Sequence, residues 1–149
     1  MRRIPWSRSI GAILGLSVAV FATLAGAAIA AETEDAVSVR IEDASARVGE
    51  QAIVVATITP RQGYRIADNY RNRVIKLSAA DAGVEFDHKA VDGTMQDGSL
   101  VFKIHVTPTK PGAHPINGVL RFGFVNHLDG DYHLDIKWLP LMATVTAAP

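Results

Sequence analysis

Period-two alternation of apolar and polar residues is the feature that most limits what this chain can fold into. It recurs in residues 37–41, 100–106, 120–124 and 134–138. Because successive side chains of a β-strand point to opposite faces of a sheet, each run is typical of a strand with one buried face. Only residues 77–82 are compatible with a helical turn, and a helix of that length is marginal on its own. The sequence therefore predicts an all-β protein.

Three further segments are predicted strands. Residues 53–58, with the sequence IVVATI, are β-branched and almost continuously apolar, which favours a central strand covered on both faces. Residues 73–77 and 84–87 supply two shorter strands. The large side chains of the alternating runs are expected to point into the core. These predicted core residues are Val37, Val39, Ile41, Leu100, Phe102, Ile104, Val106, Leu120, Phe122, Phe124, Leu134, Ile136 and Trp138.

Turn-forming residues separate the predicted strands, and glycine marks them because it adopts left-handed backbone angles without steric cost. They include Asp97-Gly98, Lys110-Pro111-Gly112, Asn117-Gly118 and Asp129-Gly130. The last lies between residues 120–124 and 134–138, which we expect to pair as a hairpin. Short strands at this spacing predict one domain, an antiparallel immunoglobulin-like β-sandwich of about seven to nine strands with its core at roughly 37–146.

The N-terminal segment has the features of a signal peptide. A basic start is followed by an uncharged apolar run at 10–24, and Ala28-Ile29-Ala30 fits the small-residue cleavage pattern. We expect cleavage after Ala30, so that residues 1–30 are the signal peptide. Residues 31–149 then form the mature periplasmic or secreted domain, with no membrane span. The alternative is a retained anchor, since the apolar run extended to Ile29 reaches the ~20 residues of a spanning helix.

Composition narrows the function classes. The 149-residue chain has no cysteine, which excludes disulfides, thiol chemistry and cysteine-ligated metal. Without the arginines of residues 1–30, 12 basic residues stand against 15 acidic ones, and a net charge of −3 gives no electrostatic footprint for nucleic acid. Neither a nucleophile elbow nor a glycine-rich phosphate loop occurs. We therefore predict no enzyme activity, no catalytic residue and no cofactor site.

One segment, residues 126–133 with the sequence NHLDGDYH, concentrates imidazoles and carboxylates. These groups are ligands for zinc or copper, so His127 and His133 define an alternative function as a periplasmic metal-binding protein. The same residues are also typical of a β-hairpin turn without metal, which we favour because only two imidazoles are close in sequence. The other histidines, His88, His105 and His114, are scattered and are expected at the surface.

Several segments between Arg47 and Val145 resemble the N-terminal periplasmic domain of the thiol:disulfide interchange protein DsbD and its stand-alone relatives. They are VVATITP leading into Gly63-Tyr64-Arg65-Ile66, Val74-Ile75-Lys76-Leu77, Phe102-Lys103-Ile104, Pro111-Gly112-Ala113-His114 and Leu120-Arg121-Phe122-Gly123-Phe124. The resemblance implies an immunoglobulin-like sandwich in the periplasm, in agreement with the strand pattern.

The resemblance also implies a redox function whose reactive residues this chain lacks. Redox-active members carry two cysteines, where this chain has Val125 and, near the second position, Asp131 or Tyr132. Arg71 is a further departure, since relatives often have proline there. Thiol exchange requires a thiolate, so we expect a redox-inactive module that acts by protein–protein contact in the cell envelope. The loop 64–70 (YRIADNY) and the segment 126–133 are the predicted contact surfaces.

Overall fold

The computed structural model describes residues 29–33, 36–127 and 132–149, with backbone only for the first of these ranges. Twelve β-strands and no helix occur in these ranges. It follows that none of the described residues belongs to a helix able to cross a membrane. The strands are β1 (Ile29–Thr33), β2 (Val37–Glu42), β3 (Ala44–Arg47), β4 (Ala52–Pro60), β5 (Tyr64–Ile66), β6 (Arg73–Ala79), β7 (Val84–Phe86), β8 (Val91–Asp92), β9 (Thr94–Gln96), β10 (Ser99–Pro108), β11 (Gly112–Asn126) and β12 (His133–Ala148).

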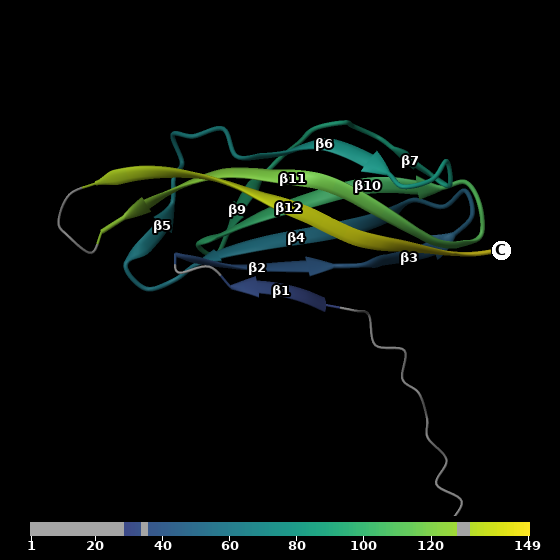
Figure 1. The fold of residues 1–149 in the computed structure, drawn as a ribbon, viewed down its shortest axis with the longest axis horizontal. Coiled ribbons are helices and arrows are strands. Elements are labelled where there is room, and N and C mark those ends of the chain that lie inside the picture. The colour runs from purple at the N-terminus through teal and green to yellow at the C-terminus, as the bar shows by residue number, and fades with distance from the viewer. Residues whose placement is uncertain (1–28, 34–35, 128–131) are drawn as a thin grey trace, which may run out of the picture.

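The strands form two sheets, with β11 and β12 of one sheet in front of β4 and β10 of the other (Figure 1). Sheet A has the order β1-β2-β4-β10-β7, and β9 also pairs with β10. Sheet B has the order β3-β12-β11-β6-β8, and β5 also pairs with β11. Paired strands are antiparallel except β3 and β12, which are parallel. The predicted all-β sandwich is confirmed, although short edge strands raise the strand number to twelve, above the predicted seven to nine.

The core lies between the two sheets. Phe102 and Ile104 on β10 and Leu120 and Phe122 on β11 have no exposed surface. Every predicted core residue up to Phe124 is buried, so alternation identified the inner face of these strands correctly. Removing this apolar surface from water stabilises the sandwich by about 25 cal/mol per Å².

One prediction for β4 is wrong. Residues 53–58 lie in β4, the middle of sheet A, but only one face of that strand is buried, since Ile53 is 43% exposed and Val54 is fully buried. The β-branched sequence therefore indicated a strand correctly, but it did not indicate burial of both faces. The helical turn with which residues 77–82 were compatible does not form, in agreement with the all-β prediction. Leu77 to Ala79 continue β6, and Ser78 and Ala79 pair with β11.

Two of the predicted glycine turns had opposite outcomes. Asp97-Gly98 forms the turn between β9 and β10, with positive φ at both residues. Asn117-Gly118 lies inside β11, at an irregularity in the pairing with β6. A Cβ atom at Gly118 would lie 3.0 Å from Cδ2 of Leu77. Glycine is used there for close packing of two strands and not for a turn.

Strand β1 overlaps the predicted end of the signal peptide. It begins at Ile29 and pairs with β2 at the edge of sheet A. The predicted cleavage point after Ala30 lies inside this strand and leaves residues 31–33 to pair with β2. Residues 1–28, which carry the other features of the predicted signal peptide, lie outside the described part of the chain.

Strand β12 carries the largest departure from the predicted core. Its pairing with β11 continues without irregularity along both strands, so residues of one parity stay on one face. From Leu139 to residue 147 the odd-numbered residues are buried. Leu134, Ile136 and Trp138 are even-numbered and lie on the outer face, 46%, 48% and 55% exposed. Their predicted place in the core is wrong. After Trp138 the apolar residues move from even to odd positions, and no β-bulge compensates for this shift.

Candidate functional site

An arginine between two aromatic rings marks the outer face of sheet B. Cζ of Arg121 lies 5.3 Å from the ring centre of Tyr70 and 5.4 Å from that of Trp138. Arg121 Nε also donates a hydrogen bond to the Tyr70 hydroxyl. Each cation–π contact contributes about 0.5–1 kcal/mol at an exposed site, so the three side chains hold one another in place. We call Tyr70, Arg121 and Trp138 the aromatic–arginine face.

The segment 67–72 positions Tyr70 over β11. The Asn72 side chain accepts a hydrogen bond from the Gly123 N–H at 2.8 Å and donates one to the Ala67 carbonyl at 2.9 Å. A Cβ atom at Gly123 would lie 3.0 Å from Cγ of Tyr70. Glycine in the strand therefore leaves the space that the tyrosine ring occupies.

Apolar side chains extend this face along β12. Leu134 and Ile136 lie on the same side of the strand as Trp138, and Met142 on that side is 62% exposed. Leu134 adjoins Gly123 and thus the Tyr70 ring, since its Cδ1 is 3.1 Å from the position of a Cβ there. Contiguous exposed apolar groups beside aromatic and arginine side chains are typical of protein interfaces.

Arginine dominates the charge next to this face. Arg71 and Arg73 hold Asp92 with N–O distances of 3.3 and 3.0 Å, and these bonds lower the pKa of the Asp92 carboxyl. Arg73 lies opposite Arg121 in the sheet, and within the described residues Arg121 has no carboxylate partner. An open pocket of about 280 Å³, lined by Tyr70 and Arg71 among others, adjoins the face. The face therefore carries positive charge beside apolar surface.

Of the predicted contact surface at residues 64–70, only the C-terminal end remains a candidate. Tyr64 lies on β5 with its ring centre 5.9 Å from that of Phe124, edge to face, and it packs against the core. Tyr70 is half-buried and belongs to the aromatic–arginine face. Of the two tyrosines, only Tyr70 is placed to contact a partner, because Tyr64 would first have to leave the core.

The predicted hairpin strands on either side of residues 128–131 pair as expected, while those four residues lie outside the described chain. The His127 ring contacts the Tyr132 ring edge to face, with centres 5.0 Å apart, and His133 is exposed. Among the described residues, no group of three or more His, Cys, Asp or Glu side chains is placed to hold a metal ion. The copper or zinc alternative stays a prediction.

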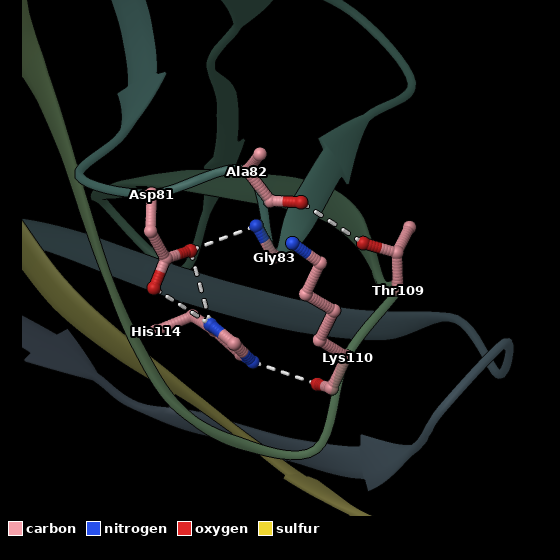
Figure 2. A network of polar contacts seen from close by, with 6 residues as sticks. All are labelled: Asp81, Ala82, Gly83, Thr109, Lys110 and His114. Carbon is pink, nitrogen blue, oxygen red and sulfur yellow. Dashed lines mark hydrogen bonds and ion pairs between the residues drawn. The ribbon is translucent and has the colours of Figure 1, made fainter.

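His114 does not lie at the surface as expected, since only 5% of the residue is exposed. Its Nδ1 lies 3.0 Å from Oδ2 of Asp81, and its Nε2 lies 2.7 Å from the Lys110 carbonyl oxygen (Figure 2). The hydrogen bond to Asp81, followed by that to the carbonyl, raises the pKa of His114. A general base needs a nitrogen that is able to accept a proton from substrate, and both ring nitrogens here are engaged. The pair is structural.

Sequence reasoning placed Trp138 in the core and did not single out Arg121 as a candidate site residue. One sequence signal for Trp138 was available, since the apolar residues move from even to odd positions between Trp138 and Leu139. A strand of continuous register cannot bury both of its faces in one core, so one of the two sets had to lie outside. The contact of Arg121 with Tyr70 had no sequence signal, since 51 positions separate the two residues.

Comparison with known proteins gives no family. No protein-family description matches the sequence, and no curated protein matches it. One similar solved structure is AggA, the major subunit of aggregative adherence fimbriae type I from Escherichia coli, with 12% identity, a TM-score of 0.40, and coverage of 78% of this chain and 98% of that one. Another is the GAE domain of GGA2p from Saccharomyces cerevisiae, with 7% identity, a TM-score of 0.36, and coverage of 76% and 97%. At these values neither similarity carries a functional argument.

Proposed function

We propose that this chain is an exported, redox-inactive β-sandwich that binds another protein in the cell envelope through the aromatic–arginine face. The observation that carries the proposal is the contact of Arg121 with Tyr70 and Trp138 on an outer sheet face lined with exposed apolar side chains. The partner is a protein segment that presents an apolar side chain beside a carboxylate, because the face offers apolar surface and an arginine with no described carboxylate partner.

The energetics of such a contact favour this face. Tyrosine, tryptophan and arginine are the residue types that contribute most to binding at protein interfaces. Here the ring contacts already restrict Arg121 and Trp138, so less conformational entropy is lost when a partner binds. A carboxylate that reaches Arg121 within a partly desolvated interface gains a charge-assisted hydrogen bond.

Export and redox inactivity have separate supports. Export rests on the signal-peptide pattern of residues 1–30. Redox inactivity rests on the absence of cysteine, since exchange requires thiolate attack on a disulfide sulfur. The relationship to the DsbD N-terminal domain rests on the sequence resemblance alone, and the proposed protein contact does not depend on it.

Site-specific photo-cross-linking tests the proposed surface. Replacing Tyr70 with p-benzoylphenylalanine keeps an aromatic ring on the face, and irradiation of cells that produce the protein should yield a defined adduct with another protein. Lys103, exposed on the outer face of sheet A, is the matched control position. The adduct at position 70 should be lost in Arg121→Glu, which reverses the charge offered to the partner's carboxylate.

The outcomes separate cleanly. An adduct at position 70 that depends on Arg121 and is absent from position 103 supports the proposal. Equal adducts at both positions, or an adduct at position 70 that persists in Arg121→Glu, would show that this face does not select a partner.

A further inference from the structure

Strand β12 leaves a long sheet edge open. One side of the strand pairs with β11 along its length, whereas the other side pairs with β3 only from Val145 to Ala148. Between His133 and Ala143 this second side pairs with no strand of the described residues. An edge of this kind is a template for a further strand, because its outward backbone groups can continue the hydrogen-bond ladder.

The backbone groups that point to this edge belong to the even-numbered residues. Thr144 N donates to Oδ1 of Asp43, on the β3 side of the strand, at 2.7 Å. The direction of the backbone groups alternates along a strand, and the β12 register has no irregularity. Leu134, Ile136 and Trp138 therefore direct their N–H and C=O groups to the open edge.

We propose that this edge pairs with the same edge of a second copy of the chain, antiparallel and centred on Ile136. In this register Ile136 lies opposite the partner's Ile136, and Leu134 lies opposite the partner's Trp138. These residues have outward backbone groups, so each opposite pair exchanges both of its N–H···O bonds. The two copies are related by a two-fold axis, and their two B sheets become one continuous sheet.

Charge selects this register. Asp135 and Lys137 flank Ile136 on the other face of the strand, so the two-fold axis sets Asp135 opposite the partner's Lys137 and Lys137 opposite the partner's Asp135. Opposite charges in directly opposed positions stabilise a pair of strands, and like charges destabilise it. The sequence around Ile136 is thus complementary to itself in the antiparallel direction.

Proline excludes the register centred two residues further along the strand, which uses the same backbone groups. Centring the axis on Trp138 would set Pro140 opposite the partner's Ile136, where proline has no N–H to donate. It would also set Lys137 opposite the partner's Leu139, so that no opposite charges face each other at this position of the interface. The Ile136 register keeps Pro140 outside the paired residues, and Pro140 ends the ladder.

This inference rests on the proposed function as a protein-binding module and names a second copy as a partner of the same strand. Continuation of the sheet leaves the aromatic–arginine face exposed on the outer side. The two B sheets then present two such faces next to each other.

Cysteine cross-linking tests the register, because the protein has no cysteine of its own. Opposite residues in a hydrogen-bonded antiparallel pair have Cα atoms about 5.5 Å apart, within the range of a disulfide. Protein expressed from the full coding sequence with Ile136→Cys should form a disulfide-linked dimer under mild oxidation. Trp138→Cys alone should not, since position 138 lies opposite position 134. An equimolar mixture of Leu134→Cys and Trp138→Cys proteins should cross-link to each other.

Charge reversal tests the same interface without cysteine. Sedimentation velocity at rising concentration should show the unmodified protein passing from monomer to dimer. Asp135→Lys and Lys137→Asp should each weaken the dimer at least tenfold, and the double variant should restore it, because the complementary pairs are re-formed in the opposite sense.

Three results would overturn the inference: a monomer up to roughly 1 mM protein, equal cross-linking at positions 136 and 138, or single and double charge variants that dimerise alike. The outcome is separable from that of the proposed function. Arg121→Glu should keep the dimer and lose the photo-adduct at position 70, whereas Asp135→Lys should lose the dimer and keep that adduct.

Discussion

His114 and Asp81 join the β6–β7 connection to the start of β11 across 33 positions of sequence, with Nδ1 of the imidazole 3.0 Å from Oδ2 of the carboxylate. Asp81 also accepts a hydrogen bond from the Gly83 N–H at 2.8 Å. Nearby, the Thr109 hydroxyl donates to the Ala82 carbonyl at 3.2 Å (Figure 2). Two loops at one end of the sandwich are therefore fixed to each other by polar contacts.

This pair predicts a stability maximum at mildly acidic pH. Asp81 raises the pKa of His114 above 6.5. The contribution of His114 to the free energy of unfolding is therefore full below pH 6.5 and is lost as the pH rises through the folded-state pKa. His114, and then the Gly83 N–H, lower the pKa of Asp81 below 3.8. The contribution of Asp81 to the free energy of unfolding is full above pH 3.8 and is lost as the pH falls through the folded-state pKa.

Urea unfolding between pH 3 and 9 measures this dependence. The difference in unfolding free energy between the unmodified protein and Asp81→Asn should be largest between about pH 4 and 6.5. Asparagine keeps an oxygen for the Gly83 N–H and removes the charge. A difference that stays constant over the whole range would show that the pair carries no pH-linked stability.

Gly83→Ala should destabilise the protein because of the His114 ring. A Cβ atom at Gly83 would lie 2.2 Å from Nδ1 of His114, which is shorter than any unstrained contact. We expect a loss of about 1–3 kcal/mol, the usual cost of overpacking a filled site. Chemical denaturation of a double-mutant cycle checks the cause, since the same substitution should cost much less in a His114→Ala background.

Trp138→Ser and Phe102→Ala should have very different effects on stability. Phe102 is fully buried, and its truncation should cost about 3–5 kcal/mol. Trp138 is 55% exposed, and its replacement should cost only about 1–2 kcal/mol, through the lost contact with Arg121 and the lost burial of the covered part of the ring. Thermal or urea unfolding of both variants compares them directly. A loss for Trp138→Ser as large as that for Phe102→Ala would place this residue in the core after all.

Copper or zinc should leave the melting temperature unchanged. His127 contacts Tyr132, and the described residues offer no group of three ligands. A metal bound only by the folded protein would raise the melting temperature by mass action. Titration of the protein and of His127→Ala with Cu²⁺ and Zn²⁺ checks this. An increase that is abolished by the substitution would establish the alternative metal function.

The alternating pattern was sufficient to predict the class of fold. Alternation in residues 100–106 and 120–124 defined buried faces that the structure reproduces, because a strand's side chains alternate whatever its neighbours are. Asp97-Gly98 predicted its turn from local backbone preference alone. Asn117-Gly118 gave a wrong prediction, because close packing against Leu77 outweighed the same kind of local preference for a turn.

The position of the candidate site, by contrast, depends on how the two sheets pack. Alternation shows that residues 134–138 have an apolar face, but it does not show whether that face meets the other sheet or solvent. The answer came from the unbroken pairing of β11 with β12, which ties these residues to the parity of Leu139 and turns Trp138 outward. Tyr70 joins Arg121 only because a loop crosses β11 at Gly123. Contacts between distant segments depend on how strands are aligned, and that alignment is set by the packing of the whole sandwich.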